Sequence, residues 1–310
     1  MHYDVIGDIH GEYDTLVSLL TELSYEEKAG VWQHTDRKVV FLGDFIDRAP
    51  KQKAVLDLVM PMVKAGHALA VMGNHEFNAL AFHTQTPDGR AWLRPRNNKN
   101  IKQHIAFLND YLGKPELLEE ALEFFWSLPM WLELDGLRII HASWDQAIID
   151  RLNEQHAGPA LTPELLALAS TKGTTEYDDV ETLLKGKELP LPKGRSFNDK
   201  DGNRREAIRV KWWDKDAVSY QDAYLGPEAA RSSIPNQPTN GAHLIEYANE
   251  SPPVVLGHYW MTGEPAPLAS NVACVDYSVA REGGKLVAYQ WQGEQTLIPE
   301  HFVSVDRSAG

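Results

Sequence analysis

The sequence predicts an α/β fold in which a sheet is covered by helices. Three observations support this prediction. Short apolar runs, partly β-branched, recur along the chain, and segments with helical periodicity lie between the early runs. At 310 residues the chain is also long enough to bury a full core. Alternating strands and helices are typical of α/β sheets whose faces are buried.

The apolar runs are predicted to be buried strands, because each is short and ends in a glycine or a polar cluster. The five that carry the later argument are Tyr3–Gly7, Lys38–Gly43, His67–Gly73, Leu137–Ala142 and Val254–Gly257. Three further strands are expected near the C-terminus, at Ala273–Tyr277, Lys285–Trp291 and Thr296–Pro299.

Apolar spacing predicts helices in the first half of the chain. They are expected after Tyr13, after Pro50, over Asn74–Ala81 and over Ile101–Ser127. Pro61 should kink the second of these, because proline removes a backbone donor. Pro115 suits the first turn of a helix.

We expect one domain, residues 1–310, with about 145–248 forming an insertion or cap over the sheet edge. This segment combines two charged helical stretches, Pro163–Ser170 and Tyr177–Lys185, with loops rich in Gly, Pro and Asn. Several residues outside the motifs are assigned to packing or to the surface. They are Trp212, Trp213, His83, His104, His243 and Cys274.

Charge and composition exclude several classes of protein. A net charge of −14 disfavours general nucleic-acid binding, because the surface repels phosphates. The single cysteine, Cys274, allows no intramolecular disulfide and fits a reducing compartment. No apolar run reaches membrane-spanning length, and the N-terminus lacks the features of a signal peptide. A cytoplasmic location without a membrane partner is therefore expected, and the oligomeric state stays open.

Each of the first five strands is followed by residues that can bind a metal. Neighbouring strands direct their carboxyl ends to one crevice, so these side chains should converge. They are Asp8 and His10 after the first run, Asp44 after the second, Asn74 after the third, His141 after the fourth and His258 after the fifth. Singly, such residues are more often caps, turn residues or core histidines. Their joint occurrence at five strand ends favours a site.

The residue types predict a centre for two divalent cations. Carboxylate, imidazole and amide ligands suit hard or borderline ions; manganese is favoured, with iron and zinc as alternatives. Two ions about 3.5–4 Å apart need a shared ligand, and we assign this bridge to Asp44. The other five ligands are divided between the ions, Asp8 and His10 for one and Asn74, His141 and His258 for the other.

The blocks GDIHGEYDTL, GDFIDRAP, VMGNHE, HAS and GH, in this order, resemble the calcineurin-like metallophosphoesterase superfamily. The resemblance is to its phosphoprotein-phosphatase branch, which includes bacterial protein phosphatases and symmetrical diadenosine tetraphosphatases. It covers Asp4–His141 and again Val254 to about Tyr289. It implies a two-sheet α/β sandwich flanked by helices, with a mixed helical and loop insertion.

The same resemblance implies a mechanism. A hydroxide that bridges the two ions would attack phosphorus in line with the leaving group. His75 would be the general acid, Asp47 would orient its imidazole, and Arg48 would bind the phosphoryl oxygens. Glu76 is expected to support the ligands through hydrogen bonds.

The sequence departs from the family pattern at three places. Met72 stands where an arginine usually precedes the glycine of GNHE, Ala49 ends the DRG triplet, and HAS replaces HGG. The missing arginine leaves open how substrate is held. The candidates for its replacement are Arg90, Arg94, Arg96 and Arg209.

The leading functional hypothesis is hydrolysis of phosphate monoesters on a phosphorylated small molecule or a phosphoprotein. One alternative is a symmetrical dinucleoside polyphosphate hydrolase that uses the same metals. Another is an inactive metal-binding interaction module, which the retention of Asp47, Arg48 and His75 disfavours. The leading hypothesis predicts faster cleavage of phosphomonoesters than of diadenosine tetraphosphate, because the long insertion could shape a specific cap.

Overall fold

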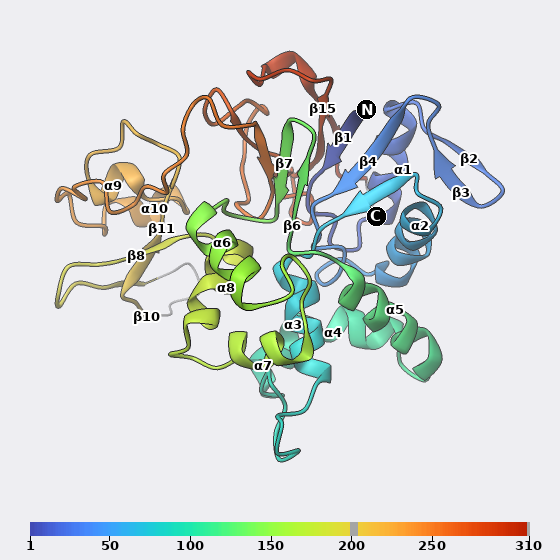
Figure 1. Ribbon diagram of the computed structural model, residues 1–310, viewed down its shortest axis with the longest axis horizontal. Coiled ribbons are helices and arrows are strands. Elements are labelled where there is room, and N and C mark those ends of the chain that lie inside the picture. Colours follow the sequence, from blue (N-terminus) through green and yellow to red (C-terminus); the bar gives the residue numbers. More distant parts are fainter. Residues whose placement is uncertain (199–203, 309–310) are drawn as a thin grey trace.

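The computed structural model describes residues 1–198 and 204–308, and two larger sheets form the centre of that part (Figure 1). The six-stranded sheet has the order β14-β15-β1-β4-β5, with β16 paired to β15. Its strands are β1 (His2–Ile6), β4 (Arg37–Phe41), β5 (Ala68–Ala70), β14 (Asp276–Tyr277), β15 (Lys285–Trp291) and β16 (Phe302–Asp306). The four-stranded sheet, β13-β12-β7-β6, comprises β6 (Trp131–Leu134), β7 (Leu137–Ile140), β12 (Val254–Leu256) and β13 (Val272–Cys274).

The pairing directions bring five strand ends to the same region. β4 runs parallel to both β1 and β5, with Val5 opposite Val40 and Val40 opposite Leu69. In the second sheet β12 runs parallel to β7, with Val255 opposite Ile139. Parallel strands deliver their carboxyl ends to one edge, so the loops that follow them can meet.

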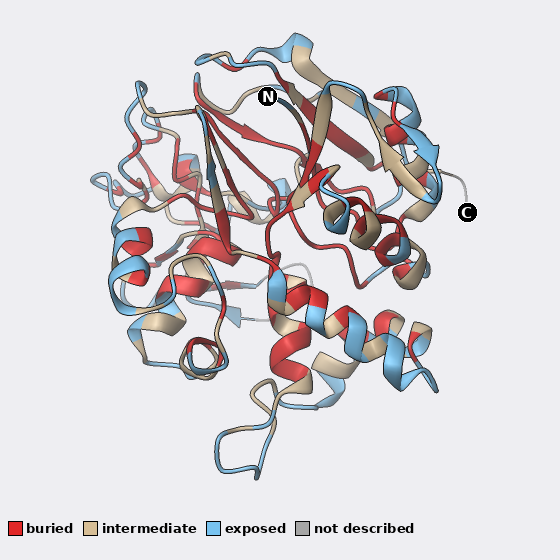
Figure 2. Ribbon diagram, turned by 45° about the vertical axis from the view of Figure 1, so that its right-hand side comes forward, coloured by how far each residue is buried: buried red, intermediate tan, exposed pale blue. Residues whose placement is uncertain are grey.

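Two hydrophobic cores explain why the strands are apolar throughout. In β4, Val40 faces a cluster between the two sheets, where it meets Ile139 and Val255 from the second sheet. Its neighbours Val39 and Phe41 face the other core, under the helices. Side chains alternate along a strand, and both faces are buried here, so no polar alternation remains. Figure 2 shows the central strands buried and the outer faces of the helices exposed.

Five helices of the first half cover the outer face of the core. They are α1 (Tyr13–Glu22), α2 (Gln52–Lys64), α3 (Asn74–His83), α4 (Asn98–Asp110) and α5 (Pro115–Ser127). The single helical stretch predicted over Ile101–Ser127 is two helices, because the chain turns at Gly113 with φ +73°. Pro115 occupies the first turn of α5, as predicted. Pro61 lies inside α2, which continues to Lys64.

Residues 145–248 contain two parts that differ in their packing. Helices α6 (Gln146–Gln155), α7 (Pro163–Ala169) and α8 (Thr175–Lys185) bury Leu152, Leu165 and Leu183 in the main core. The second part builds a separate cluster that includes Leu189 and Ile208. It contains β8 (Glu188–Pro190), β9 (Phe197–Asn198), β10 (Arg204–Arg205), β11 (Ala207–Arg209), α9 (Tyr220–Ala223) and α10 (Glu228–Arg231), and lies at one side of the molecule (Figure 1). Residues 199–203 of this segment lie outside the described residues. That the segment is an insertion stays a prediction.

The predicted α/β fold of two sheets flanked by helices is confirmed, with strands shorter than expected. The strand predicted at Thr296–Pro299 is wrong. Leu297 N–H donates to Ser270 O and Ile298 N–H to the Tyr289 hydroxyl, so this backbone does not join a ladder. A short 3₁₀ helix, η1 (Pro299–His301), follows and leads into β16. A small hairpin of β2 (Glu26–Lys28) and β3 (Val31–Gln33) was not predicted.

Among the described helices, none has the length and apolar character needed to cross a bilayer.

A buried ion pair links the neighbouring strands β1 and β4. Asp4 is fully buried, and Arg37 Nε lies 2.9 Å from each of its carboxylate oxygens. The Tyr25 hydroxyl donates to the same carboxylate at 2.9 Å. A charge buried in this way is tolerated because its partners compensate the lost hydration.

Replacing Arg37 by alanine should therefore strongly destabilise the protein. Asp4 would remain buried without its cation, and the expected loss is about 3–5 kcal/mol in free energy of unfolding, measured by urea denaturation. Arg90→Ala is the matched control, because its pair with Asp88 is largely exposed, and it should cause little change. Equal effects of the two substitutions would contradict this account.

Candidate metal centre

The structure brings the six predicted metal ligands together at the ends of five strands. Asp8 and His10 follow β1, Asp44 follows β4, Asn74 begins α3 just after β5, His141 follows β7 and His258 follows β12. All six are buried. They converge because the parallel strands of both sheets end on the same side.

Asp44 lies at the centre of this cluster. Its Oδ2 is 3.7 Å from His10 Nε2 and 3.5 Å from His141 Nε2. Two groups of residues could each hold a metal ion, His10 with Asp44 and His75, and Asp44 with His141 and His258. Within each group the ligand atoms lie within 4.8 Å of one another. Asp44 is common to both groups, which is the position required of a bridging ligand.

Backbone carbonyls set the orientation of two histidines. His10 Nδ1 lies 2.9 Å from Ile46 O, and His141 Nδ1 lies 2.7 Å from Leu42 O. A carbonyl can only accept, so each Nδ1 carries the proton and each Nε2 is directed to Asp44. Both carbonyls belong to the turn that follows β4. This turn therefore supplies Asp44 and also orients its neighbours.

The donor set fits divalent cations. Nε2 of His10 and of His258 is buried and has no hydrogen-bond partner among the described residues. Burial, reinforced by the charge of His75, lowers the pKa of His10 to about 3, so its imidazole is neutral at pH 7. Burial and the charge of Arg209 also hold the pKa of His258 well below its ordinary value. Neutral imidazoles with an available nitrogen are good metal ligands.

The carboxylates of the centre also require compensating positive charge. Burial and the neighbouring Asp276 raise the pKa of Asp8 well above its ordinary value. For Asp44, burial acts in the same direction, but the charges of His141 and His75 outweigh it and hold the pKa well below its ordinary value. Burial opposes the charged form of His141, whereas Asp44 and Asp8 favour it and raise its pKa to about 10. Metal binding at this position would be coupled to loss of that proton.

Asp276 is a buried acidic residue that the sequence motifs did not indicate. It accepts the backbone N–H of Trp260 at 2.7 Å and that of Ser278 at 2.9 Å. Its charge acts on Asp8, so it belongs to the electrostatic surroundings of the centre. No motif marks this residue, because it begins the edge strand β14 and reaches the centre only through the pairing of the strands.

Glu76 connects the two loops that carry Asp44 and Asn74. Its carboxylate accepts the backbone N–H of Asp44 at 2.8 Å, of Phe45 at 2.9 Å and of Gly73 at 3.1 Å. The loops approach so closely that a Cβ at Gly73 would lie 2.4 Å from Asp44 N. Glycine is therefore required at this contact.

Backbone strain is concentrated at the centre. Non-glycine residues with positive φ include His10 (50°), Asp44 (50°), Asp47 (68°), Arg48 (78°) and His258 (70°). This region of φ costs energy for residues with a Cβ and is found mainly where surrounding structure enforces it. Five of the nine residues predicted for the site adopt it, which supports a functional constraint on these turns.

A chain of three side chains extends from the centre to α4. His75 Nδ1 lies 2.5 Å from Asp47 Oδ2, and His104 Nδ1 lies 2.8 Å from Asp47 Oδ1. Burial raises the pKa of Asp47, but hydrogen bonds from His104 and His75 dominate and hold it well below its ordinary value. Burial lowers the pKa of His75, but Asp44 and Asp47 together raise it. His104, expected to be a surface or packing residue, is buried and also holds Asp47, and no motif marks it.

The arginines around the centre differ in their surroundings. Arg48 is exposed at the mouth of the site and lies within electrostatic reach of Asp44 and Asp276. Met72, which replaces the family's arginine, is fully buried in the main core and cannot reach a substrate. A different arginine would have to take that role.

Arg209 on β11 is the best placed of the four candidates. Its Nε is buried without a hydrogen-bond partner among the described residues, and its charge acts on His258. The others have different contacts. Arg90 pairs with Asp88, Arg96 stacks on Trp92, and Arg94 donates to Asn78 and Gln103.

Comparison with known proteins identifies the family of this chain. The family model for calcineurin-like phosphoesterases matches residues 1–235. The chain belongs to this family. The phosphoesterase is therefore an enzyme, a hydrolase that acts on phosphoesters and whose family uses divalent metals.

Its curated relatives include several proteins with one name, asymmetrical bis(5'-nucleosyl)-tetraphosphatase PrpE. The phosphoesterase is 42% identical over 194 residues to the one from Geobacillus sp. (strain WCH70), a match that covers 60% of this chain and 75% of the relative. It is 43% identical over 170 residues to the one from Oceanobacillus iheyensis, covering 50% and 61%. With the relative from Halalkalibacterium halodurans the identity is 47% over 76 residues, covering 24% and 31%. The chain thus spans less than two thirds of the latter two relatives.

Solved structures with a similar chain path include a cold-active protein-tyrosine phosphatase from a psychrophilic Shewanella sp. It is 17% identical with a TM-score of 0.48, and the match covers 99% of this chain and 80% of that one. A protein serine/threonine phosphatase from Saccharomyces cerevisiae is 12% identical with a TM-score of 0.48, covering 100% and 81%.

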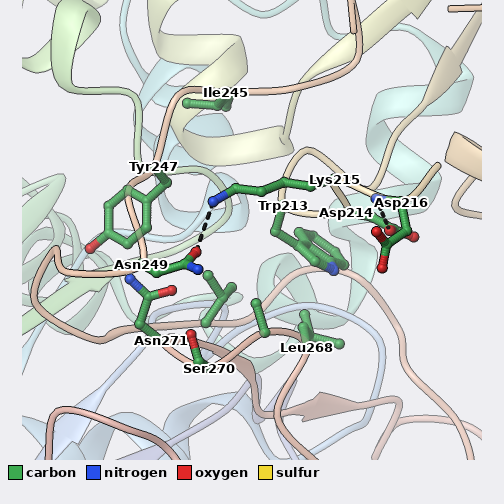
Figure 3. Close-up of a pocket in the computed structure, with 12 residues that line it drawn as sticks. Trp213, Asp214, Lys215, Asp216, Ile245, Tyr247, Asn249, Leu268, Ser270 and Asn271 are labelled. Carbon is green, nitrogen blue, oxygen red and sulfur yellow. Dashed lines mark hydrogen bonds between the residues drawn. The ribbon is translucent and has the colours of Figure 1, made fainter. Parts of the chain in front are cut away.

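A cavity of about 240 Å³ lies away from the metal centre (Figure 3). It is lined by Trp213 and by Ser270, Asn271 and Val272 at the start of β13, whereas His258 follows the opposite end of the parallel strand β12. Lys215 Nζ donates to Asn249 Oδ1 across it at 2.8 Å. Trp213 packs edge-to-face on the fully buried Trp212, as expected for a packing pair.

Substituting Glu76 by glutamine should weaken metal binding. One carboxylate oxygen would become an NH₂ group facing backbone donors, so the loop that carries Asp44 would lose its support. We expect a 10- to 100-fold lower affinity for Mn²⁺, which is about the effect of removing groups that orient metal ligands, measured by calorimetry on stripped protein. Glu133→Gln, an exposed carboxylate on β6, is the control. Unchanged affinity in Glu76→Gln would rule out this role.

Proposed function

We propose that this phosphoesterase hydrolyses dinucleoside polyphosphates, with diadenosine tetraphosphate as the test substrate. The observation that carries the proposal is the 42% identity over 194 residues to a protein named for tetraphosphate cleavage. The relatives favour this alternative over hydrolysis of phosphate monoesters. Because they are named asymmetrical, we further propose cleavage to ATP and AMP, in place of the symmetrical cleavage to two ADP considered from the sequence.

The proposed ligands are Asp8, His10, Asp44, Asn74, His141 and His258, with manganese as the favoured ion and iron and zinc as alternatives. Two cations bound there would act as Lewis acids and lower the pKa of bound water. The residues themselves have further tasks. Asp44 is shared by the two ligand groups, and Glu76 holds its loop in place. We also propose a cytoplasmic location, which the single cysteine supports.

His75 is proposed as the proton donor to the leaving oxygen. Its Nε2 is directed into the centre, 3.9 Å from Asp44 Oδ2, while its Nδ1 is held by Asp47. Asp44 and Asp47 raise the pKa of His75, which favours the protonated ring that a general acid requires. Asp47 and His104 fix the ring and are positioning residues. The leaving group of an anhydride is a phosphate, a weaker base than an alkoxide, so it needs this proton less.

Arg48 and Arg209 are proposed to bind the phosphoryl oxygens. Arg48 comes from the turn after β4, and Arg209 comes from β11 in residues 145–248. A buried Nε without a partner is costly, and a phosphate oxygen would satisfy it. This placement also supports the proposal that residues 145–248 act as a cap, since the segment would supply one of the two arginines.

The reaction can be tested by product analysis. With Mn²⁺ and diadenosine tetraphosphate, we expect equal amounts of ATP and AMP by anion-exchange chromatography, and no products with EDTA. His75→Asn should lower kcat by about 100-fold, the low end for general acid catalysis because the leaving phosphate is weakly basic, while Mn²⁺ still binds. His67→Asn, a half-buried histidine before β5, is the control.

Two results would overturn parts of this proposal. ADP as the dominant nucleotide would replace asymmetrical by symmetrical cleavage. Turnover of p-nitrophenyl phosphate without any cleavage of the dinucleotide would support hydrolysis of phosphate monoesters and contradict the present proposal.

Replacing Arg209 tests the proposed clamp. Arg209→Ala should raise KM for diadenosine tetraphosphate and for p-nitrophenyl phosphate alike, by about 10-fold or more, because a charge-assisted hydrogen bond to the reacting phosphate is lost. Arg204→Ala, an exposed arginine of the same segment, should leave both values unchanged. Wild-type KM values in Arg209→Ala would exclude a contact with substrate.

A further inference from the structure

Trp260 contacts two arginines beside the metal centre. The guanidinium carbon of Arg48 lies 4.0 Å from the centre of its ring, and that of Arg281 lies 3.7 Å from it. The ring of His10, a proposed metal ligand, is 6.2 Å away between centroids. We call Arg48, Trp260 and Arg281 the arginine–tryptophan stack. It begins at the centre and leads to exposed residues of the loop between β14 and β15.

The backbone holds this stack in place. Trp260 donates its N–H to Asp276 Oδ2 at 2.7 Å, and Met261 donates to Asp276 O at 2.9 Å. Trp260 itself has φ +55°, a strained conformation that these contacts enforce. Arg281 lies in a tight turn, in which its N–H donates to Ser278 O at 2.8 Å. Backbone hydrogen bonds therefore hold the segments that carry Trp260 and Arg281.

The charge arrangement indicates an anionic ligand. The protein carries a net charge of −14, yet two exposed arginines converge on one indole. The charge of Arg48 interacts with the carboxylates of Asp44 and Asp276 in the centre, and Arg281 contacts the same indole as Arg48. A guanidinium that stacks through its face keeps its N–H groups at the edge, where their planar fork matches phosphate oxygens.

We propose that the arginine–tryptophan stack is a second anionic subsite, which binds phosphates of a polyphosphate chain beyond the phosphate that reacts. This inference rests on the proposed function, since a chain of phosphates must extend from the centre. Arg48 contacts the reacting phosphate and Arg281 the next ones outward. A phosphomonoester has no second phosphate, so Arg281 should distinguish the two substrate classes.

The test compares substrates that differ in phosphate number. Arg281→Met keeps an unbranched side chain against the indole but removes the charge. We expect KM for diadenosine tetraphosphate to rise about 10- to 100-fold, the cost of a lost charge-assisted hydrogen bond, and KM for p-nitrophenyl phosphate to rise less than about threefold. Arg281→Lys should recover only part of the loss, because ammonium lacks the planar fork. Arg90→Ala serves as the control, and thermal unfolding checks that each variant is folded.

A second arm does not depend on the dinucleotide being a substrate. Inorganic tripolyphosphate and orthophosphate are compared as inhibitors of p-nitrophenyl phosphate hydrolysis at fixed free Mn²⁺. Arg281→Met should weaken inhibition by tripolyphosphate at least about 10-fold, and inhibition by orthophosphate far less. Suppose that Arg281→Met weakens only the inhibition by tripolyphosphate, and the wild type does not cleave the dinucleotide. This result would support the subsite and overturn the proposed function. Suppose instead that the wild type cleaves the dinucleotide, and Arg281→Met changes inhibition by both phosphates equally or not at all. This result would overturn the subsite and leave the proposed function intact.

Discussion

The site depends on one buried carboxylate. Asp44 has histidine nitrogens on two sides, at 3.7 Å from His10 and 3.5 Å from His141, and its other oxygen accepts the backbone N–H of His75 at 2.9 Å. A carboxylate with 2% exposure is stable only if it is surrounded by donors or cations. The close loop contacts, the supporting Glu76 and the strained turns all serve to hold this one group in place.

The two sheets make that arrangement possible. Asp44 and the carbonyls that orient His10 and His141 come from the turn after β4, while His141 and His258 come from the other sheet. The apolar layer between the sheets keeps these strand ends at a constant separation. The strain of the turns is therefore compensated by packing elsewhere in the molecule, as is usual at functional sites.

Much of this organisation could be predicted from local sequence. Strands such as the one before Asp8 and the one before Asp44 are short apolar runs with a glycine at the end, and their carboxyl ends must meet in a parallel sheet. Residues outside the motifs could not be found in this way. His104 and Arg281 acquire their contacts only through packing between distant elements. Thr296–Pro299 failed as a strand because its backbone donors pair with a loop and a tyrosine.

Residues 188–234 contain a hydrophobic cluster that includes Leu189, Ile208 and Tyr224, while Trp212 and Trp213 of the same range pack in the core under the metal ligands. The residues of that cluster are not among those that pack under the strand ends where chemistry occurs. Arg209 lies on β11 between Ile208 and Val210 of this cluster, and its charge acts on His258. Substitutions around Arg209 could therefore change how substrate is held while the metal ligands keep their positions.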